Sequence, residues 1–209
     1  KKEFTKFGVN AKDIIHYRAI DAAVITKRKI SKNSKKPAKK AKRKIILVRV
    51  EEEEASYSSK KRPAVPIIKE IIKKFHNEEI VVMGRYSSQV KHLAQTFGDK
   101  IKILDKVVDG KALLNNVDVF VGSGGTMTAE SALLGIPTIS YNAIPNIVEA
   151  YLVRKKLVLR KRNPKQITVS VRKLLDSPNL EIKKRAKNML DSMEDPFPIL
   201  VKTMKSILK

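Results

Sequence analysis

The sequence contains no cysteine and no tryptophan, and no apolar run approaches the length of a membrane span. The lack of cysteine excludes disulfides and thiolate metal sites, which fits a reducing compartment. A transmembrane helix needs about 18 consecutive apolar residues, and no stretch of the sequence supplies them. No segment has the pattern of a secretion signal. We therefore expect a cytoplasmic protein.

Acidic residues are scarce relative to basic ones. Among 209 residues there are 45 Lys and Arg but only 21 Asp and Glu, which gives a formal net charge of +24. A charge of this size attracts polyanions such as nucleic acid, anionic lipid or nucleotide phosphates. Only five tyrosines and six phenylalanines accompany the charge, so a base-stacking platform for single strands is poorly supplied. Non-specific attraction to nucleic acid is favoured over sequence-specific recognition.

The basic residues are concentrated in one segment. Residues 27–44 hold eleven Lys or Arg and no acid, interleaved with serine, proline and small residues. Such a composition is typical of a linker with almost nothing to bury. It predicts four parts: a remnant or exit segment of an N-terminal domain at 1–26, the basic linker at 27–44, a Rossmann-like domain at 45–193, and a C-terminal helix at 194–209.

The rest of the chain alternates between short apolar runs, typical of strands, and amphipathic stretches, typical of helices. We predict strands at 45–50, 80–83, 101–104, 117–121, 138–141 and 157–159. We predict helices at 65–75, 89–97, 110–115, 126–134, 147–155, 164–175, 179–192 and 198–208, with a further helix at 2–7 and a strand-like segment at 13–17. Strands separated by helices of this length indicate a parallel sheet with right-handed crossovers and helices on both faces, an α/β Rossmann-like fold.

The most informative motif follows the predicted strand 117–121. It reads Gly122-Ser123-Gly124-Gly125-Thr126 and leads into a predicted helix. Such a junction presents free backbone N–H groups and the positive end of a helix dipole, and glycine has no Cβ to keep an anion away. The motif is not the dinucleotide fingerprint, because Met127 stands where a third glycine is needed, and it lacks the lysine of a P-loop. We interpret it as a binding site for a different diphosphate.

Two interpretations of Glu130 are possible. If Thr126 caps the helix, Glu130 lies about one turn inside it, where its carboxylate can accept hydrogen bonds from the two hydroxyls of a ribose. In the other reading, Glu130 only complements the helix dipole. The residues alone leave both readings open.

Further candidates follow the other strands, because ligands of such sheets bind beyond the carboxyl ends of the strands. Arg49 and Arg85 can supply forked donors to a diphosphate. Tyr57 and Tyr86 can stack on a base or be ordinary half-buried tyrosines. The acidic run 51–54 is interpreted as a solvated loop rather than a divalent-ion site. The three histidines are far apart and form no ligand pair, so we expect no metal site.

The segment from Gly122 to Ser140 resembles the signature of an archaeal family of uncharacterised predicted glycosyltransferases. It is similar, more distantly, to the donor-binding domain of UDP-N-acetylglucosamine 2-epimerase and of the peptidoglycan transferase that adds N-acetylglucosamine to a lipid-linked precursor. In those relatives a Ser-Gly-rich turn binds the nucleotide diphosphate and a glutamate in the following helix holds the ribose. The resemblance implies these roles for Gly124, Gly125, Thr126 and Glu130.

Three further segments carry the resemblance. Arg49 with the Ala-Ser-Tyr at 55–57 is similar to an Arg-Pro-Pro…Ala-x-Tyr segment of the family, although Val-Glu replaces Pro-Pro. Arg85-Tyr86 with Gln89 resembles its Pro-Arg-Tyr…Gln segment, with glycine in place of proline, and Asp109-Gly110 also matches. The expected nucleotide-sugar-binding residues are Arg49, Tyr57, Arg85, Asp109, Gly122, Ser123, Gly124, Gly125, Thr126 and Glu130.

The resemblance implies the C-terminal, donor-binding half of a two-Rossmann-domain glycosyltransferase fold. Its substrate would be a UDP-sugar or similar nucleotide sugar, with no cofactor and no metal. An N-terminal domain or a second chain would supply the acceptor half, so no residue here is assigned as catalytic. A lysine-rich protein peripheral to the inner face of the membrane would suit a lipid-linked acceptor. Two alternatives remain: an isomerase of the UDP-sugar 2-epimerase type, and a non-catalytic basic protein that binds RNA or an anionic membrane.

Overall fold

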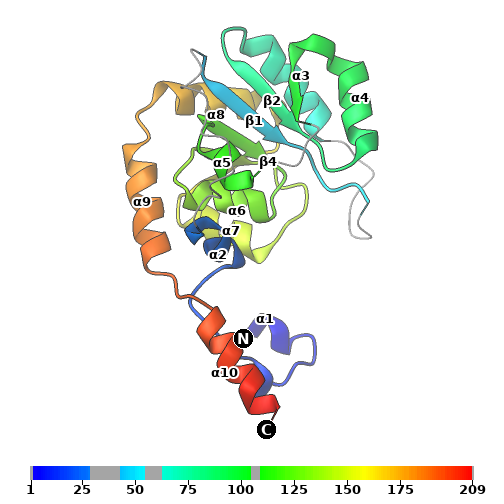
Figure 1. The fold of residues 1–209 in the computed structure, drawn as a ribbon. Helices are drawn as coiled ribbons and strands as arrows, with labels where there is room; N and C mark the ends of the chain where they lie inside the picture. Colours follow the sequence, from blue (N-terminus) through cyan, green and yellow to red (C-terminus); the bar gives the residue numbers. More distant parts are fainter. Residues whose placement is uncertain (1, 29–42, 55–62, 105–108, 209) are drawn as a thin grey trace.

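Six parallel strands form a single sheet at the centre of the computed structural model, which describes residues 2–28, 43–54, 63–104 and 109–208 (Figure 1). The strands are β1 (Ile45–Arg49), β2 (Glu79–Met83), β3 (Lys102–Leu104), β4 (Val119–Gly122), β5 (Thr138–Ser140) and β6 (Val158–Arg160). Their order in the sheet is β3-β2-β1-β4-β5-β6, and every neighbouring pair is parallel. The order reverses between β1 and β4, which is where ligands of this fold bind.

Helices cover both faces of the sheet because its central strands are apolar on both sides. In β1, Ile46 and Val48 belong to one buried cluster and Leu47 belongs to another. The first cluster includes residues of α3 (Ala64–Lys74), α4 (Ser87–Phe97) and α8 (Pro164–Asp176). The opposite side carries α5 (Gly110–Leu114), α6 (Thr126–Leu133) and α7 (Ile147–Arg154), with α2 (Asp21–Lys27) and α9 (Leu180–Asp191) packed outside α6. The predicted fold class is confirmed.

The two ends of the described chain lie apart from the sheet. The short α1 (Lys2–Thr5) and α10 (Phe197–Ile207) lie below the rest of the molecule in Figure 1. An ion pair of 2.7 Å between Arg18 Nε and Glu194 Oε1 joins the segments that lead to them. In the ranges that the structure covers, no helix combines the length and the apolar character that crossing a bilayer requires.

The predicted helices and strands from residue 45 onward agree with the structure to within two residues at each end. The strand-like segment predicted at 13–17 is wrong. Only Asp13 of this segment lies in a regular element, the 3-10 helix η1 (Ala11–Asp13), whose start is capped by the Asn10 side chain accepting a hydrogen bond of 3.2 Å from Lys12 N, and residues 14–17 form neither helix nor strand. Ile15 is 53% exposed, so this segment has no apolar face to bury in a sheet. A second 3-10 helix, η2 (Gly98–Lys100), follows α4, and most of the predicted basic linker, 29–42, lies outside the described residues.

Candidate functional site

The turn between β4 and α6 requires glycine at three positions. Gly124 and Gly125 have φ angles of +104° and +81°, in the left-handed region that favours glycine. A Cβ on Gly122 would stand 2.5 Å from a ring carbon of Phe120 and 2.6 Å from the Thr128 hydroxyl, so no side chain fits there. The three glycines therefore allow the backbone to pass tightly from the sheet into the helix.

The N-terminus of α6 has no side-chain cap. Gly125 occupies the N-cap position and Thr126 is the first helical residue, so Glu130 lies about one turn inside the helix with Gly125, not Thr126, at the cap. Thr128, deeper in the helix, donates its hydroxyl to Gly124 O at 3.0 Å. Ser123 and Gly124 are buried, whereas Gly125 and Thr126 are exposed. The first-turn N–H groups of α6 are thus open to solvent, an arrangement suited to an anion.

Two arginines lie close to this turn. Nη2 of Arg85, which follows β2, lies 4.0 Å from the position of a Cβ built on Gly125. Arg49, at the end of β1, donates from Nη1 to Gly84 O at 2.6 Å. Burial, and then the neighbouring Arg85, lower the pKa of Arg49 to about 10, so the Arg49 guanidinium stays charged at neutral pH. The structure brings two cations to the open end of α6.

Glu52 and Tyr86 complete what we call the arginine cluster, which comprises Arg49, Glu52, Arg85 and Tyr86. Glu52 Oε2 lies 3.4 Å from Arg85 Nη1, on a different nitrogen from the one near Gly125. The Tyr86 hydroxyl donates to Glu52 Oε1, and Glu54 N donates to the same oxygen at 3.1 Å. The hydrogen bond to Glu52 raises the pKa of Tyr86 to about 12, so the phenol keeps its proton. No sequence pattern singled out Glu52 within the acidic run.

The acidic run 51–54 is only partly a solvated loop, which corrects the sequence interpretation. Glu51 is 3% exposed and accepts hydrogen bonds from the Tyr141 hydroxyl at 2.8 Å and from Ala64 N, at the start of α3, at 3.2 Å. Burial raises the pKa of Glu51 and that of Tyr141. Gln89 donates to the backbone carbonyl of Glu51 at 2.9 Å.

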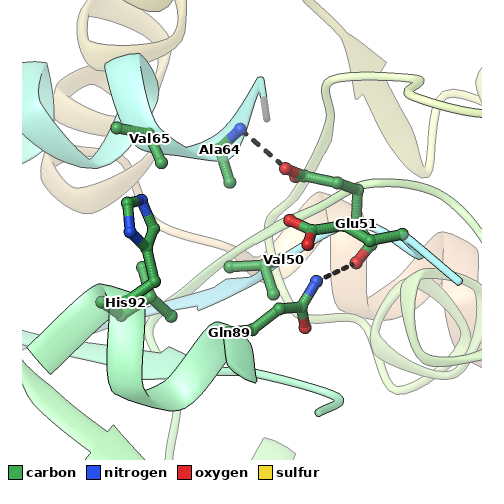
Figure 2. A pocket seen from close by; sticks show the side chains of 8 residues that line it. Val50, Glu51, Ala64, Val65, Gln89 and His92 are labelled. Carbon is green, nitrogen blue, oxygen red and sulfur yellow. Dashed lines mark hydrogen bonds between the residues drawn. The ribbon is translucent and has the colours of Figure 1, made fainter. Parts of the chain in front are cut away.

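Figure 2 shows Glu51 and Gln89 beside a hollow between α3 and α4, with the two hydrogen bonds to Ala64 N and Glu51 O dashed. The hollow is lined by Val50, Glu51, Glu53, Ala64, Val65, Gln89, His92 and Leu93. Glu51 is bonded to the protein on two sides here, so its function is to hold the β1 exit in place. No group of three His, Cys, Asp or Glu side chains in the described part of the chain could hold a metal ion.

A second group, the carboxylate cluster, comprises Asp21, Arg28, Asp109 and Glu130. Glu130 is the fifth residue of α6 and 9% exposed, and it has no hydrogen bond or ion pair with any described residue. Its Oε2 lies 3.6 Å from the position of a Cβ on Gly110, so the start of α5 packs beside it. Burial raises the pKa of Glu130, opposed by the charge of Arg28.

Arg28 and Asp109 form the rest of this cluster. Asp109 caps α5 by accepting from Lys111 N at 2.9 Å and Ala112 N at 3.1 Å. Its other oxygen lies 3.2 Å from Arg28 Nη2. Arg28 follows α2, which packs on α6, so only tertiary structure brings it here; the sequence signal was merely its place in the basic run.

The predicted site residues therefore fall into two groups around α6. Arg49 and Arg85 lie with the turn 122–126, whereas Asp109 and Glu130 lie together on the α5 side. The two groups have no charge partner in common. Tyr57 lies outside the described residues.

The sheet order and the glycine turn define a Rossmann-like protein of the B-type glycosyltransferase fold, and solved structures support this class. The Staphylococcus aureus MnaA–UDP co-structure has a TM-score of 0.65 at 13% identity, covering 99% of this chain and 57% of that chain. The Methanocaldococcus jannaschii UDP-GlcNAc 2-epimerase in complex with UDP-GlcNAc and UDP has a TM-score of 0.60 at 14% identity, covering 91% and 57%. Spinosyn rhamnosyltransferase SpnG complexed with thymidine diphosphate gives 0.60 at 16% identity, covering 80% and 46%. At these identities the likeness establishes the fold.

The family follows from sequence. Residues 4–209 match the family described as "Protein of unknown function (DUF354)", and the chain belongs to it. It is 34% identical over 115 residues to the Uncharacterized protein MJ0665 of Methanocaldococcus jannaschii, a match that covers 54% of this chain and 33% of that protein. The chain spans about half the length of the solved structures it resembles, and the match to the curated relative covers a third of that protein. The predicted resemblance is confirmed.

Proposed function

We propose that this chain is the nucleotide-sugar-binding part of a glycosyltransferase-like protein that transfers a sugar to an acceptor. One observation carries the proposal: the uncapped start of α6 has a guanidinium beside Gly125 and, one turn further in, the Glu130 carboxylate, which has no hydrogen bond or ion pair with a described residue. A nucleoside diphosphate offers the matching groups, two phosphates and a vicinal diol.

The diphosphate would lie on the exposed N–H groups at Gly125 and Thr126, within reach of Arg85. Charged hydrogen bonds from a guanidinium to phosphate are among the strongest in proteins, and a helix N-terminus adds an oriented dipole. When the bond between the sugar and the distal phosphate breaks, negative charge grows on the leaving diphosphate. Arg85, with Arg49 behind it, would stabilise that charge without reorganising.

The ribose would bind to Glu130. An ionised carboxylate can accept hydrogen bonds from two hydroxyls, and Glu130 has no described partner to displace. The alternative, that Glu130 serves the helix dipole, is weaker because the residue stands fifth in α6 and the dipole effect falls off within the first turn. The arrangement therefore favours the ribose role.

We propose that the acceptor and the general base belong to a further domain or a second chain. The structures that this chain resembles are longer, with 57% of MnaA and of the 2-epimerase covered. Tyr57 stays a predicted contact to the base of the nucleotide. No residue of this chain is proposed as the general base.

The second candidate is an isomerase of the UDP-sugar 2-epimerase type. The coverage of 91% of this chain by the 2-epimerase favours it, since the rhamnosyltransferase covers only 80%. Incubation of UDP-GlcNAc with this chain together with the domain or chain that completes it separates the two candidates, because only an isomerase produces an epimer without an acceptor.

Calorimetry with UDP, dTDP and their sugars tests the proposal. We expect Arg85→Ala and Glu130→Ala each to weaken binding more than tenfold, or about 1.4 kcal/mol. Lys91→Ala and Glu181→Ala remove the same charges from exposed positions and should change affinity less than twofold. Native-like affinity in both site variants would reject the proposal. Tight binding of RNA or anionic vesicles by a chain that binds no nucleotide would favour a non-catalytic basic protein.

A further inference from the structure

Arg85 stands between two anion positions. Its Nη2 faces Gly125 at the open start of α6, with 4.0 Å to a Cβ there, and its Nη1 faces the Glu52 carboxylate at 3.4 Å. Any phosphate on α6 therefore has the guanidinium on one side and, past the guanidinium, a carboxylate. Glu52 thus lies on the far side of the Arg85 guanidinium from the phosphate position.

The two clusters give a bound nucleotide a direction. In the proposed function the ribose is at Glu130, in the carboxylate cluster, and the phosphates cross the start of α6 toward Arg85. The group on the distal phosphate then leaves the helix on the arginine side. In a nucleotide sugar that group is the sugar, which places it next to Glu52 and the Tyr86 hydroxyl.

Resting on the proposed function, we infer that Glu52 is a specificity-determining residue that selects a donor with an uncharged sugar over one whose sugar carries a carboxylate. A hydroxyl-rich sugar can donate hydrogen bonds to Glu52. A uronate would face the Glu52 carboxylate directly, and like charges at such distances repel strongly when partly buried.

Glu52 is held firmly enough to act in this way. Its Oε1 accepts hydrogen bonds from Tyr86 and from Glu54 N, and its side chain is 15% exposed. Glu53, half-buried in the same loop, adds a second negative charge nearby. Two carboxylates thus lie in the loop beyond Arg85, even though the whole chain carries +24.

The carboxylates near Arg85 and the positive net charge of the whole chain predict opposite preferences between two donors. The net charge of the protein alone would favour the more anionic donor, so a preference for the neutral one must come from a local carboxylate. UDP-glucose and UDP-glucuronic acid are matched probes, because they differ only in whether C6 of the sugar is a hydroxymethyl or a carboxylate group.

The experiment measures the dissociation constants of UDP, UDP-glucose and UDP-glucuronic acid at physiological salt. We expect the unaltered chain to bind UDP-glucose at least tenfold more tightly than UDP-glucuronic acid. Glu52→Gln should reduce this ratio to about threefold or less while binding UDP at least as tightly as before. Tyr86→Phe, which removes the hydrogen bond that holds Glu52, should give an intermediate ratio.

Glu54→Gln is the control, since it removes the same charge from an exposed position two residues away. Its ratio should stay within twofold of the unaltered chain. Equal affinity of the unaltered chain for the two sugars, or a ratio that Glu52→Gln leaves unchanged, would overturn the inference while the proposed function stands. Loss of UDP binding in Glu52→Gln would overturn it too, because Glu52 would then serve only to position Arg85. A chain that binds none of the three ligands would overturn the proposed function itself.

Discussion

The arginine cluster and the carboxylate cluster lie beside the same helix but differ in how their charges are matched. In the arginine cluster every described charge has a partner, since Arg49 is bonded to Gly84 O and Arg85 is paired with Glu52. In the carboxylate cluster Asp109 is paired with Arg28, but Glu130 has no described partner. A phosphate at Arg85 competes with the carboxylate that Arg85 already contacts, whereas a ribose at Glu130 donates to a carboxylate that has no described hydrogen bond. The two clusters should therefore respond differently to mutation, to the choice of ligand and to pH.

The largest expected effect comes from a substitution in the glycine turn that both clusters depend on. Gly122→Ala places a methyl group 2.5 Å from the Phe120 ring, so the turn must shift. We expect a loss of about 2 kcal/mol in the free energy of unfolding, together with loss of UDP binding. Urea denaturation and calorimetry measure the two. Gly110→Ala, where the nearest atom is 3.6 Å away, should leave stability nearly unchanged. Equal stability of both variants would show that the turn is less constrained than its contacts indicate.

The next effect separates the two clusters. Arg85→Ala should weaken UDP binding more than tenfold and leave uridine affinity unchanged, because the nucleoside has no phosphate. Glu130→Ala should weaken both ligands by a similar factor, since both carry the ribose. The two losses should add in the double variant to within about 0.5 kcal/mol, as expected for sites without shared partners. Strong non-additivity would mean that the clusters are coupled through α6.

A smaller effect concerns pH and belongs to the carboxylate cluster. Burial raises the pKa of Glu130 above 4.5, so the carboxylate is protonated at a higher pH than in an ordinary glutamate. Because ribose binding uses the ionised form, the affinity for UDP-glucose, whose phosphates stay ionised over this range, should fall as the pH is lowered from 7 to 5. Glu130→Gln should bind UDP-glucose weakly with a flat pH profile in this range. An unchanged pH dependence in that variant would assign the titration to another group.

The same shift predicts that Glu130→Gln leaves the fold intact. A raised pKa in the folded state means that the group favours folding below its unfolded pKa, and that this contribution is lost as pH rises through the folded pKa. At neutral pH the buried charge therefore disfavours the folded state. Thermal denaturation of Glu130→Gln at pH 7 should show a melting temperature equal to or above that of the unaltered chain, even though nucleotide affinity is lower.

The smallest effect on nucleotide binding comes from the basic segment. Replacing the seven lysines within 29–42 by glutamine should leave UDP affinity within twofold, while affinity for polyanions and its salt dependence fall. Titration with heparin at several salt concentrations measures the second quantity. A collapse of UDP affinity would instead place this segment at the nucleotide site.

The sequence predicted most of the fold because the β-branched runs and glycine punctuation are local signals. The failures were tertiary. The segment from Asp13 to Tyr17 has the pattern of a strand but no partner strand among the described residues, and Glu51, expected in a solvated loop, is buried and bonded to Tyr141. The arginines and the glycine turn were predictable from their places after strands. Arg28 and Glu52 were not, because each reaches the site only through packing or through one side-chain contact.

The hydrogen bonds of Tyr141 to the β4–α6 turn and the β1 exit affect how fast a ligand binds. Its backbone N donates to Gly122 O at 2.9 Å, and its hydroxyl lies within hydrogen-bond distance of Arg49 O and Glu51. Ala143 N holds Ser123 O in the same way, at 3.0 Å. The turn is thus shaped by the core before any nucleotide arrives, so little conformational entropy is lost on binding. A preorganised turn favours fast association of a nucleotide, near the rates of electrostatically steered encounters. Differences in affinity between two donors should then come mainly from how long each stays bound.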